Sequence, residues 1–270
     1  MRSACTLVGS LSIAALVAAA PLHADKTVQK TLPLAADGEV RIDTYKGTIT
    51  VTAGTSNQVE VVARVTPDGD DRDQPRKVEE TEIRIGGGGS SISIESDYDK
   101  VKGHGWSSFL GGFGNDGTLP LVHYTVKMPA TARLVVKDYK SESRIAGVGD
   151  VTFETYKGKA QLSGLRKPTR IETYKGDIRV DFEAFEGGRF DTYKGRIAAH
   201  LPRDARFDLD ADRGKRGEVD SDFSLVSGGE SRRYRSRRHD DDERLRASVN
   251  GGGPRLSFET YKGTLELKSR

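Results

Sequence analysis

The sequence predicts an all-β fold, a single-stranded parallel β-helix or β-solenoid with coils of about 18 residues, preceded by N-terminal β-strands. The first observation is an acidic-Thr-Tyr-Lys-Gly pentapeptide that occurs five times, at 43–47, 154–158, 172–176, 191–195 and 259–263. The second is its period, because Tyr156, Tyr174 and Tyr193 follow one another at nearly equal intervals, and a degenerate copy at Tyr139 extends the series backwards. A period this short does not fit paired helices and suits one coil of a β-helix.

Each pentapeptide lies between two stretches in which apolar and polar residues alternate. Around the second copy, the alternation runs through 151–155, stops at Lys157-Gly158 and resumes through 160–163. A period of two is typical of a half-buried strand, so each copy predicts a strand, a tight corner and a second strand. We expect the glycine to supply a positive φ at the corner, because it can adopt this conformation without a Cβ clash.

Stacked coils align each repeated position into a column at the strand spacing of about 4.8 Å. Tyrosine then lies on tyrosine, and an acidic column runs beside a lysine column. One interpretation is that these columns only stabilise the stack, by aromatic contact and alternating charge. The other is a binding surface for a polymer such as a glycan or peptidoglycan strand, since stacked aromatics suit sugar rings and lysines suit anionic groups. The residues of this candidate surface are Tyr45, Tyr156, Lys157, Tyr174, Lys175, Tyr193, Lys194, Tyr261 and Lys262.

Residues 1–24 have the features of a secretory signal peptide. Arg2 precedes an apolar stretch from Leu7 to Ala20, which is too short to span a membrane. Cleavage after Ala24 removes Cys5, the one cysteine of the sequence, so we expect neither disulfides nor thiol chemistry in the mature chain. No later stretch is apolar enough to predict a transmembrane segment. We therefore expect an exported protein, periplasmic or extracellular, with envelope association and oligomeric state left open.

Residues 25–125 predict N-terminal strands followed by an aromatic, glycine-rich loop. Alternating residues favour strands within 40–51 and 59–65, which we expect to cover one end of the core. Two further strands, at 83–85 and 92–94, are separated by four glycines, and we interpret them as a pair joined by a glycine connection.

The loop from Tyr98 to Thr118 contains Trp106, Phe109 and Phe113 among several glycines. One interpretation is that these aromatic side chains cover the end or side of the coil stack, as solenoids require. The other is that they form a candidate partner loop, which contacts a membrane surface or a groove of another protein.

Residues 126–270 predict the solenoid repeats, with a charged insertion at about 230–246. Five arginines precede four acidic residues there, which favours either a solvated excursion between coils or a basic patch for anionic lipid or glycan. We predict no metal site in the insertion, because its carboxylates are consecutive and lack an ordered turn. The segment 208–214 lacks the glycine and the glutamate of a calcium loop and fits a divergent coil with its aspartates facing solvent.

Several of these stretches together resemble a known family. They are Tyr-Thr-Val-Lys-Met-Pro at 124–129, Leu-Val-Val at 134–136, the repeated glycine-containing strand pairs, and the closing Thr-Tyr-Lys-Gly-Thr-Leu at 260–265. Through these stretches, residues from about 40 to 267 resemble the bacterial putative-adhesin family of unknown function, whose members carry β-strand repeats. The resemblance implies a right-handed β-helix or β-roll in an exported or envelope-associated protein, and it brings no catalytic residues.

Composition and motifs argue against several functions. Lysine and arginine number 43 against 40 acidic residues, so the chain is near neutral and gives no case for nucleic-acid binding. It has no Gly-x-Ser-x-Gly, His-Glu-x-x-His or phosphate-loop motif, and we predict no catalytic residue and no cofactor. The sequence favours a non-enzymatic, adhesin-like scaffold that binds an envelope glycan or a protein partner. The alternative is a polysaccharide hydrolase or lyase built on a β-helix.

Overall fold

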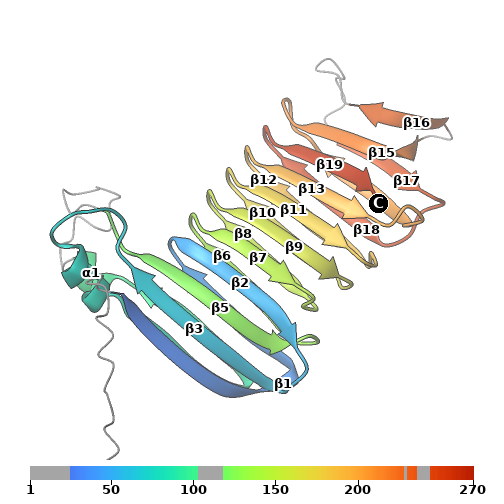
Figure 1. Cartoon of the computed structure of the whole chain (residues 1–270). Coiled ribbons are helices and arrows are strands. Elements are labelled where there is room, and N and C mark those ends of the chain that lie inside the picture. The colour runs from blue at the N-terminus through green and yellow to red at the C-terminus, as the bar shows by residue number, and fades with distance from the viewer. Residues whose placement is uncertain (1–24, 103–117, 228–229, 236–243) are drawn as a thin grey trace, which may run out of the picture.

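The computed structural model of the chain describes residues 25–102, 118–227, 230–235 and 244–270. Within these residues the fold is all-β, as predicted, with nineteen strands in one hydrogen-bonded sheet and two short helices, α1 (Gln74–Glu80) and α2 (Asp99–Lys102). The predicted signal peptide at 1–24 lies outside the described residues. Figure 1 shows most of the strands stacked side by side in two layers, with α1 at the N-terminal end of the stack. No helix in the described ranges is long and apolar enough to cross a membrane.

The first layer consists mainly of parallel strands, each paired with a strand from the previous or next repeat. Its order in space is β4 (Glu82–Asp97), the second half of β1 (Lys26–Thr44), β6 (Arg133–Asp138), β8 (Val151–Thr155), β10 (Thr169–Thr173), β12 (Gly188–Thr192), β18 (Arg255–Thr260) and β14 (Phe207–Asp212). The register is continuous, since Phe153 pairs with Ile171, which pairs with Phe190, which pairs with Phe258.

The second layer repeats this arrangement with the partner strands. Its order is β5 (Leu121–Pro129), β2 (Gly47–Gly54), β7 (Glu142–Ala146), β9 (Lys159–Leu165), β11 (Asp177–Phe182), β13 (Arg196–Leu201), β19 (Thr264–Ser269) and β15 (Glu218–Ser227). We call one strand of each layer, with the corner that joins them, a rung. Each pentapeptide forms the corner of one rung, as the alternation of apolar residues predicted.

Both ends of the stack depart from the predicted single-stranded β-helix. At the N-terminal end, β3 (Gln58–Thr66) pairs antiparallel with the first half of β1 and with β5, so these strands cover that end of the core. At the C-terminal end, β17 (Arg244–Val249) and β16 (Glu230–Arg235) pair antiparallel with β14 and β15. Since β16 and β17 take up both ends of the predicted insertion at 230–246, that segment contributes strands at its edges.

The strand order also differs from the chain order near the C-terminus. The rung formed by β18 and β19 lies between the rung of β12 and β13 and the rung of β14 and β15, although it comes last in the sequence. Figure 1 shows this rung inside the stack, with the C-terminus at the end of β19 and with β15 and β17 beyond it. The order of the rungs in space therefore differs from their order in the chain at this rung.

A second correction concerns the four glycines at 86–89. They do not join two strands, because β4 continues through them as one strand from Glu82 to Asp97 that runs parallel to β1. Three of these glycines have a positive φ, so the strand is distorted at the glycines without turning back.

The core lies between the inner rows of the two layers. Phe153, Ile171 and Phe190 of the first layer and Ile178 and Ile197 of the second are fully buried. Burial of one such side chain stabilises the fold by roughly 1.5–3 kcal/mol. In β14 the residues at 207, 209 and 211 are buried while the aspartates between them face outward, as predicted for the divergent coil at 208–214.

Candidate functional site

Six tyrosines form a continuous ladder along the corners of the rungs. Successive ring centroids are 4.7–4.9 Å apart and successive ring planes differ by 5–12°. The order in space is Tyr45, Tyr139, Tyr156, Tyr174, Tyr193 and Tyr261. Five predicted tyrosines therefore lie in one column, and the degenerate copy at Tyr139 fills the place between the first two. The tyrosine ladder thus runs without a gap from the first pentapeptide to the last.

The Thr and Gly of each pentapeptide fix the corner that holds the tyrosine. At the third copy, the backbone N–H of Gly176 donates a hydrogen bond of 2.7 Å to the hydroxyl of Thr173, and Gly158, Gly195 and Gly263 do the same with their threonines. The threonine points inward and is buried. The side chain thus satisfies a buried backbone donor at the tightest point of the chain.

The glycine is needed for a reason other than the predicted one. Only Gly47 among the five pentapeptide glycines has a positive φ. At Gly176 a Cβ would lie 2.6 Å from the carbonyl oxygen of Gly158 in the neighbouring rung, and at Gly195 it would lie 2.5 Å from that of Gly176. Both distances are too short for any real contact. The glycines therefore permit the close approach of successive corners.

One corner uses an aspartate instead of threonine. The carboxylate of Asp138 accepts hydrogen bonds from the backbone N–H groups of Lys140 and Ser141 and from the hydroxyl of Thr155, at 2.8–3.1 Å. Burial raises the pKa of Asp138, although these hydrogen bonds act in the opposite direction. The carboxyl of Asp138 thus takes the place of the threonine hydroxyl at this corner, and unlike a hydroxyl it can be charged.

The N-terminal end of the tyrosine ladder is covered by another aromatic residue. Tyr98 packs edge-on against Tyr45, with centroids 6.2 Å apart, and its hydroxyl donates to the carbonyl oxygen of Pro120. Burial raises the pKa of Tyr45, and the neighbouring Tyr139 adds to this. Lys46, the lysine of this first copy, is buried and forms an ion pair of 2.5 Å with Asp68. The first rung therefore differs from the later ones in the packing of Tyr98 on its tyrosine and in the burial of its lysine.

The stacking geometry corrects the reason given above for glycan binding. Each inner ring has a neighbouring ring on both faces, at the distances just described, so those faces cannot receive a sugar ring. What remains accessible is the outer edge with its hydroxyl, and Tyr193 and Tyr261 are 37% and 47% exposed. The tyrosine ladder thus presents a row of hydrogen-bonding hydroxyls at regular spacing and no aromatic platform.

A groove runs along one side of the tyrosine ladder. It has a volume of about 890 Å³ and crosses the rungs of β8, β10, β12 and β18, where it is lined by the last four tyrosines of the ladder and by the acidic residues of the last four pentapeptides. We call this the acidic groove. Its carboxylates are paired with basic residues of the same layer: Lys137 with Glu154, Arg170 with Glu172, and Arg189 with both Asp191 and Glu259, at 2.8–3.8 Å.

The lysines of the repeat lie on the other side of the tyrosines. A separate hollow of about 460 Å³ is lined by Tyr45, Tyr139, Lys140 and Lys157 with three of their neighbours, and by none of the pentapeptide acids. The backbone N–H of each lysine donates to the carbonyl oxygen of the tyrosine one rung away, at 2.8–3.0 Å, so the lysines follow the rungs in step. We call Lys140, Lys157, Lys175, Lys194 and Lys262 the lysine row.

The lysine row has no acidic partners within the described residues, where no carboxylate oxygen lies within 4.0 Å of its five ammonium groups. The last four each hold their Nζ 5.1–5.3 Å from the centroid of the preceding tyrosine. This is within the range of a cation–π contact, although the stacked neighbours occupy the ring faces. The predicted pairing of the acidic column with the lysine column is therefore wrong: the acids pair with arginines and Lys137 instead.

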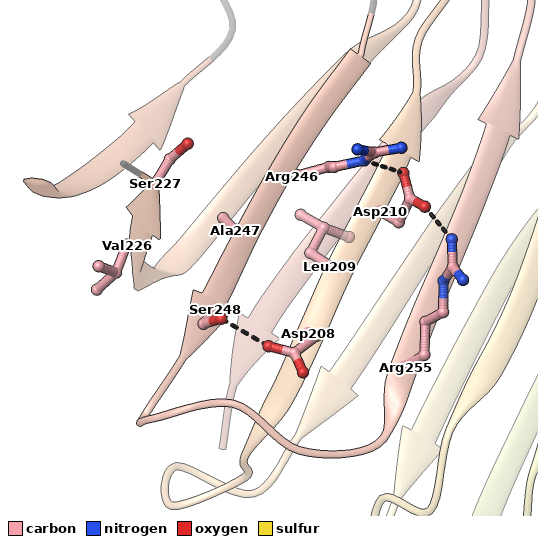
Figure 2. Close-up of a pocket in the computed structure, with 9 residues that line it drawn as sticks. All are labelled: Asp208, Leu209, Asp210, Val226, Ser227, Arg246, Ala247, Ser248 and Arg255. Carbon is pink, nitrogen blue, oxygen red and sulfur yellow. Dashed lines mark hydrogen bonds and ion pairs between the residues drawn. The ribbon is translucent and has the colours of Figure 1, made fainter. Parts of the chain in front are cut away.

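A further polar cluster lies at the C-terminal end of the first layer. Asp210 of β14 is an acceptor for three arginines: Arg244 at 2.8 and 2.9 Å, Arg246 at 3.6 Å, and Arg255. Figure 2 shows its carboxylate between Arg246 and Arg255, and the hydroxyl of Ser248 donating to Asp208, two residues earlier in β14. The hydrogen bonds from Arg244, followed by Arg255, hold the pKa of Asp210 well below its usual value.

The remaining predicted residues lie elsewhere. Trp106, Phe109 and Phe113, the candidate partner loop, fall outside the described residues. Both ends of that loop are held in place, by the packing of Tyr98 and by a hydrogen bond from Gln74 to the carbonyl oxygen of Thr118. In the part of the chain that the structure describes, no group of three or more His, Cys, Asp or Glu side chains could hold a metal ion.

Comparison with known proteins gives structural likenesses at low identity. No family model and no curated protein matches the chain. A crystal structure of a "putative cell adhesion protein" from Clostridium sporogenes is 10% identical, with a TM-score of 0.45 over 91% of this chain and 100% of that one. A "putative adhesin" from Bacteroides fragilis is 11% identical, with a TM-score of 0.43 over 91% and 97% of the two chains.

A third crystal structure, a "putative adhesin" from Parabacteroides distasonis, is 12% identical, with a TM-score of 0.31 over 90% of this chain and 97% of that one. These descriptions agree with the family that the sequence resembles. At such identities the function of this chain has to be argued from its own residues.

Proposed function

We propose that this chain is an exported, non-enzymatic, adhesin-like protein whose rungs form a β-solenoid scaffold and bind an extended glycan along the tyrosine ladder. The observation that carries the proposal is the continuity of the ladder, which presents the same hydroxyl edge on six successive rungs. A linear polymer meets an equivalent set of groups at each rung. Weak contacts of this kind add up along one molecule, because each bound segment raises the effective concentration of the next.

The chemistry of the exposed edge supports a glycan. A tyrosine hydroxyl both donates and accepts hydrogen bonds, as sugar hydroxyls do. The acidic groove beside it adds carboxylates on four rungs, at Glu154, Glu172, Asp191 and Glu259, with their basic partners, which are one lysine and two arginines. These groups hydrogen-bond to polyols as well. The signal peptide predicted at 1–24 is the basis for placing this activity outside the cytoplasm.

The pairing of the groove carboxylates favours binding over catalysis. Glycoside hydrolysis needs one carboxylic acid that keeps its proton and a second carboxylate across the scissile bond. Here each pentapeptide acid that lines the groove forms an ion pair with a basic side chain. Asp138, which also lines the groove, already accepts hydrogen bonds from Lys140, Ser141 and Thr155. The absence of turnover is accordingly part of the proposal, and bond cleavage is its direct contradiction.

The proposal is tested with a variant that removes hydroxyls and keeps the rings. Tyr156→Phe, Tyr174→Phe and Tyr193→Phe together preserve the stack and delete three adjacent hydroxyls. Binding of the purified full chain to a glycan array and to sedimented peptidoglycan should weaken at least tenfold in this variant. Tyr124→Phe deletes the hydroxyl of a tyrosine that is fully buried and not part of the ladder, so it is the control and should bind as the wild type does.

Two results would overturn the proposal. One is binding that is unchanged in the triple variant, which would move the site away from the ladder. The other is the appearance of shortened or unsaturated sugar products when the bound glycan is incubated with wild-type protein and examined by mass spectrometry. That result would favour the polysaccharide-active enzyme instead.

A further inference from the structure

The charged groups on one side of the tyrosine ladder form ion pairs, and those on the other side do not. In the acidic groove, Glu154, Glu172, Asp191 and Glu259 each have a basic partner within 3.8 Å. Across the ladder, the five ammonium groups of the lysine row have no carboxylate within 4.0 Å in the described residues. The chain has nearly equal numbers of acidic and basic residues, yet the charges are paired in the acidic groove and not in the lysine row.

The arrangement of the lysine row sets the charges at short, regular intervals. Because each lysine N–H donates to the tyrosine carbonyl one rung away, their backbones repeat at the rung spacing, which the rings report as 4.7–4.9 Å. This is shorter than the screening length of about 8 Å at physiological ionic strength, so neighbouring ammonium groups repel one another. The first lysine of the repeat, Lys46, has an acidic partner and is buried, so the charged run begins at Lys140.

We propose that the lysine row is a binding site for a linear anionic polysaccharide, one that carries a carboxylate or sulfate group on successive sugars and lies parallel to the tyrosine ladder. This rests on the proposed function and names the class of glycan. A polyanion placed along the row replaces the repulsion by attraction at every rung and releases the counterions that both partners held. The tyrosine hydroxyls beside the row then meet the uncharged hydroxyls of the same sugars.

The same geometry argues against a nucleic acid as the occupant. Single-stranded nucleic acids are held by basic side chains together with aromatic faces on which the bases stack. The inner rings of the tyrosine ladder have both faces occupied by neighbouring rings, so that platform is absent from the middle of the row. A polysaccharide needs only the charge and the hydroxyl edge.

The test compares two triple variants with the same loss of charge on the same part of the stack. Lys157→Gln, Lys175→Gln and Lys194→Gln remove three central charges of the lysine row. Arg144→Gln, Arg166→Gln and Lys167→Gln form the control variant, which removes three positive charges from exposed positions outside the tyrosine ladder, the acidic groove and the lysine row. Thermal unfolding checks that both variants are folded. The probes are polygalacturonate (a carboxylated polymer), heparin (a sulfated polymer), dextran (a neutral polymer) and single-stranded oligothymidylate, each titrated at several salt concentrations.

We expect polygalacturonate or heparin to bind the wild type, the lysine variant to lose at least tenfold in affinity, and the control variant to stay within about threefold. The dependence of affinity on salt should also become weaker in the lysine variant, because fewer counterions are displaced. Carboxylate and sulfate are distinguished by which of the two polymers binds more tightly.

Other outcomes would overturn the inference. Equal losses in the two variants would mean that binding follows total charge and not the row. Tighter binding of oligothymidylate than of either anionic polysaccharide would replace the occupant with a nucleic acid. Binding of dextran that matches the anionic polymers and ignores the lysine variant would refute this inference while leaving the proposed function intact. If no probe binds while glycan capture is still lost in the triple tyrosine variant, this inference is likewise refuted and the proposed function stands.

Discussion

Replacing Gly176 by alanine tests the spacing of the rungs. The backbone of Gly176 has no positive φ, so alanine is compatible with its conformation. The space is not available, because the new Cβ would lie 2.6 Å from the carbonyl oxygen of Gly158 and 2.5 Å from the hydroxyl of Thr173. Ordinary contacts begin near 3.4 Å. The two rungs must therefore separate locally by several tenths of an ångström.

The cost follows from the hydrogen bonds at that corner. Three backbone hydrogen bonds of 2.9–3.3 Å join neighbouring rungs there. The N–H groups of Lys175, Asp177 and Arg196 donate to the carbonyl oxygens of Tyr156, Gly158 and Gly176, respectively. Weakening two of them costs about 0.5–1.5 kcal/mol each, and overpacking of a buried site adds about 1–3 kcal/mol. We expect Gly176→Ala to lower the free energy of unfolding by about 2–6 kcal/mol, measured by urea denaturation followed by far-UV circular dichroism.

Gly86→Ala is the matched control. Gly86 lies in β4, has no positive φ, and has no atom within 4 Å of the position of a new Cβ. Alanine there should be neutral or stabilising by up to about 1 kcal/mol, because it reduces the freedom of the unfolded chain. If Gly176→Ala proves no more destabilising than Gly86→Ala, the explanation of the regular rung spacing by close approach at the glycines is wrong.

Further variants test the two faces and the charged groups. Ile178→Asp should cost several kcal/mol of unfolding free energy because it buries a carboxylate between rungs, whereas Lys175→Ala should change it by less than about 1 kcal/mol; similar losses in urea melts would show that the faces are assigned wrongly. Since the folded-state pKa of Asp138 lies above its unfolded value, the ionised carboxylate destabilises the fold at neutral pH, and the wild type should gain stability relative to Asp138→Thr as the pH falls from 7 to 4. A difference that runs the other way in pH-dependent urea melts would mean that the hydrogen bonds outweigh burial. Asp210→Asn should lower the melting temperature, and added salt should reduce the loss because it screens the three arginines that the carboxylate joins; a loss that does not depend on salt would point to packing instead.

Much of the regular part of the molecule follows from local sequence. The alternation at 151–155 and 160–163 assigns the inner rows because side chains of a strand point to opposite faces. The repeat of the pentapeptide aligns the tyrosines because equal rungs in register place equal residues one above another. Both inferences use only neighbours in the chain, which is why they agree with the structure at Tyr156, Tyr174 and Tyr193.

The contacts of the candidate site were only partly predictable, because some of them join segments that are far apart in the sequence. The arginines at 170 and 189 each precede the pentapeptide acid by two positions, so they lie on the same face of the strand and pair with it. That spacing is visible in the sequence and would have identified the partners of the acidic column. The capping of Tyr45 by Tyr98 depends on a contact between distant segments, for which the sequence carries no periodic signal.

The position of the last rung had a signal that period alone does not use. The copy at 259–263 is complete, whereas the chain at 212–217 has neither the threonine nor the tyrosine of the repeat. A complete copy fits directly against another complete copy, since a Cβ on Gly263 would lie 2.6 Å from the carbonyl oxygen of Gly195. The degenerate corner is suited to the place beyond it, where the tyrosine ladder ends.

The rung of β18 and β19 comes last in the sequence and lies inside the stack, which affects the order in which the strands can assemble. A ribosome delivers β14 and β15 before β18 and β19, yet the first pair has no final place until the second has joined β12 and β13. Chain ends usually tolerate trimming or a fused tag. Here the last strand is held on both sides, and the N–H of Arg270 still donates to Leu201. Removal of residues 255–270 would leave an internal gap in the sheet, because β18 and β19 lie between other strands, and the shortened chain could not close the stack.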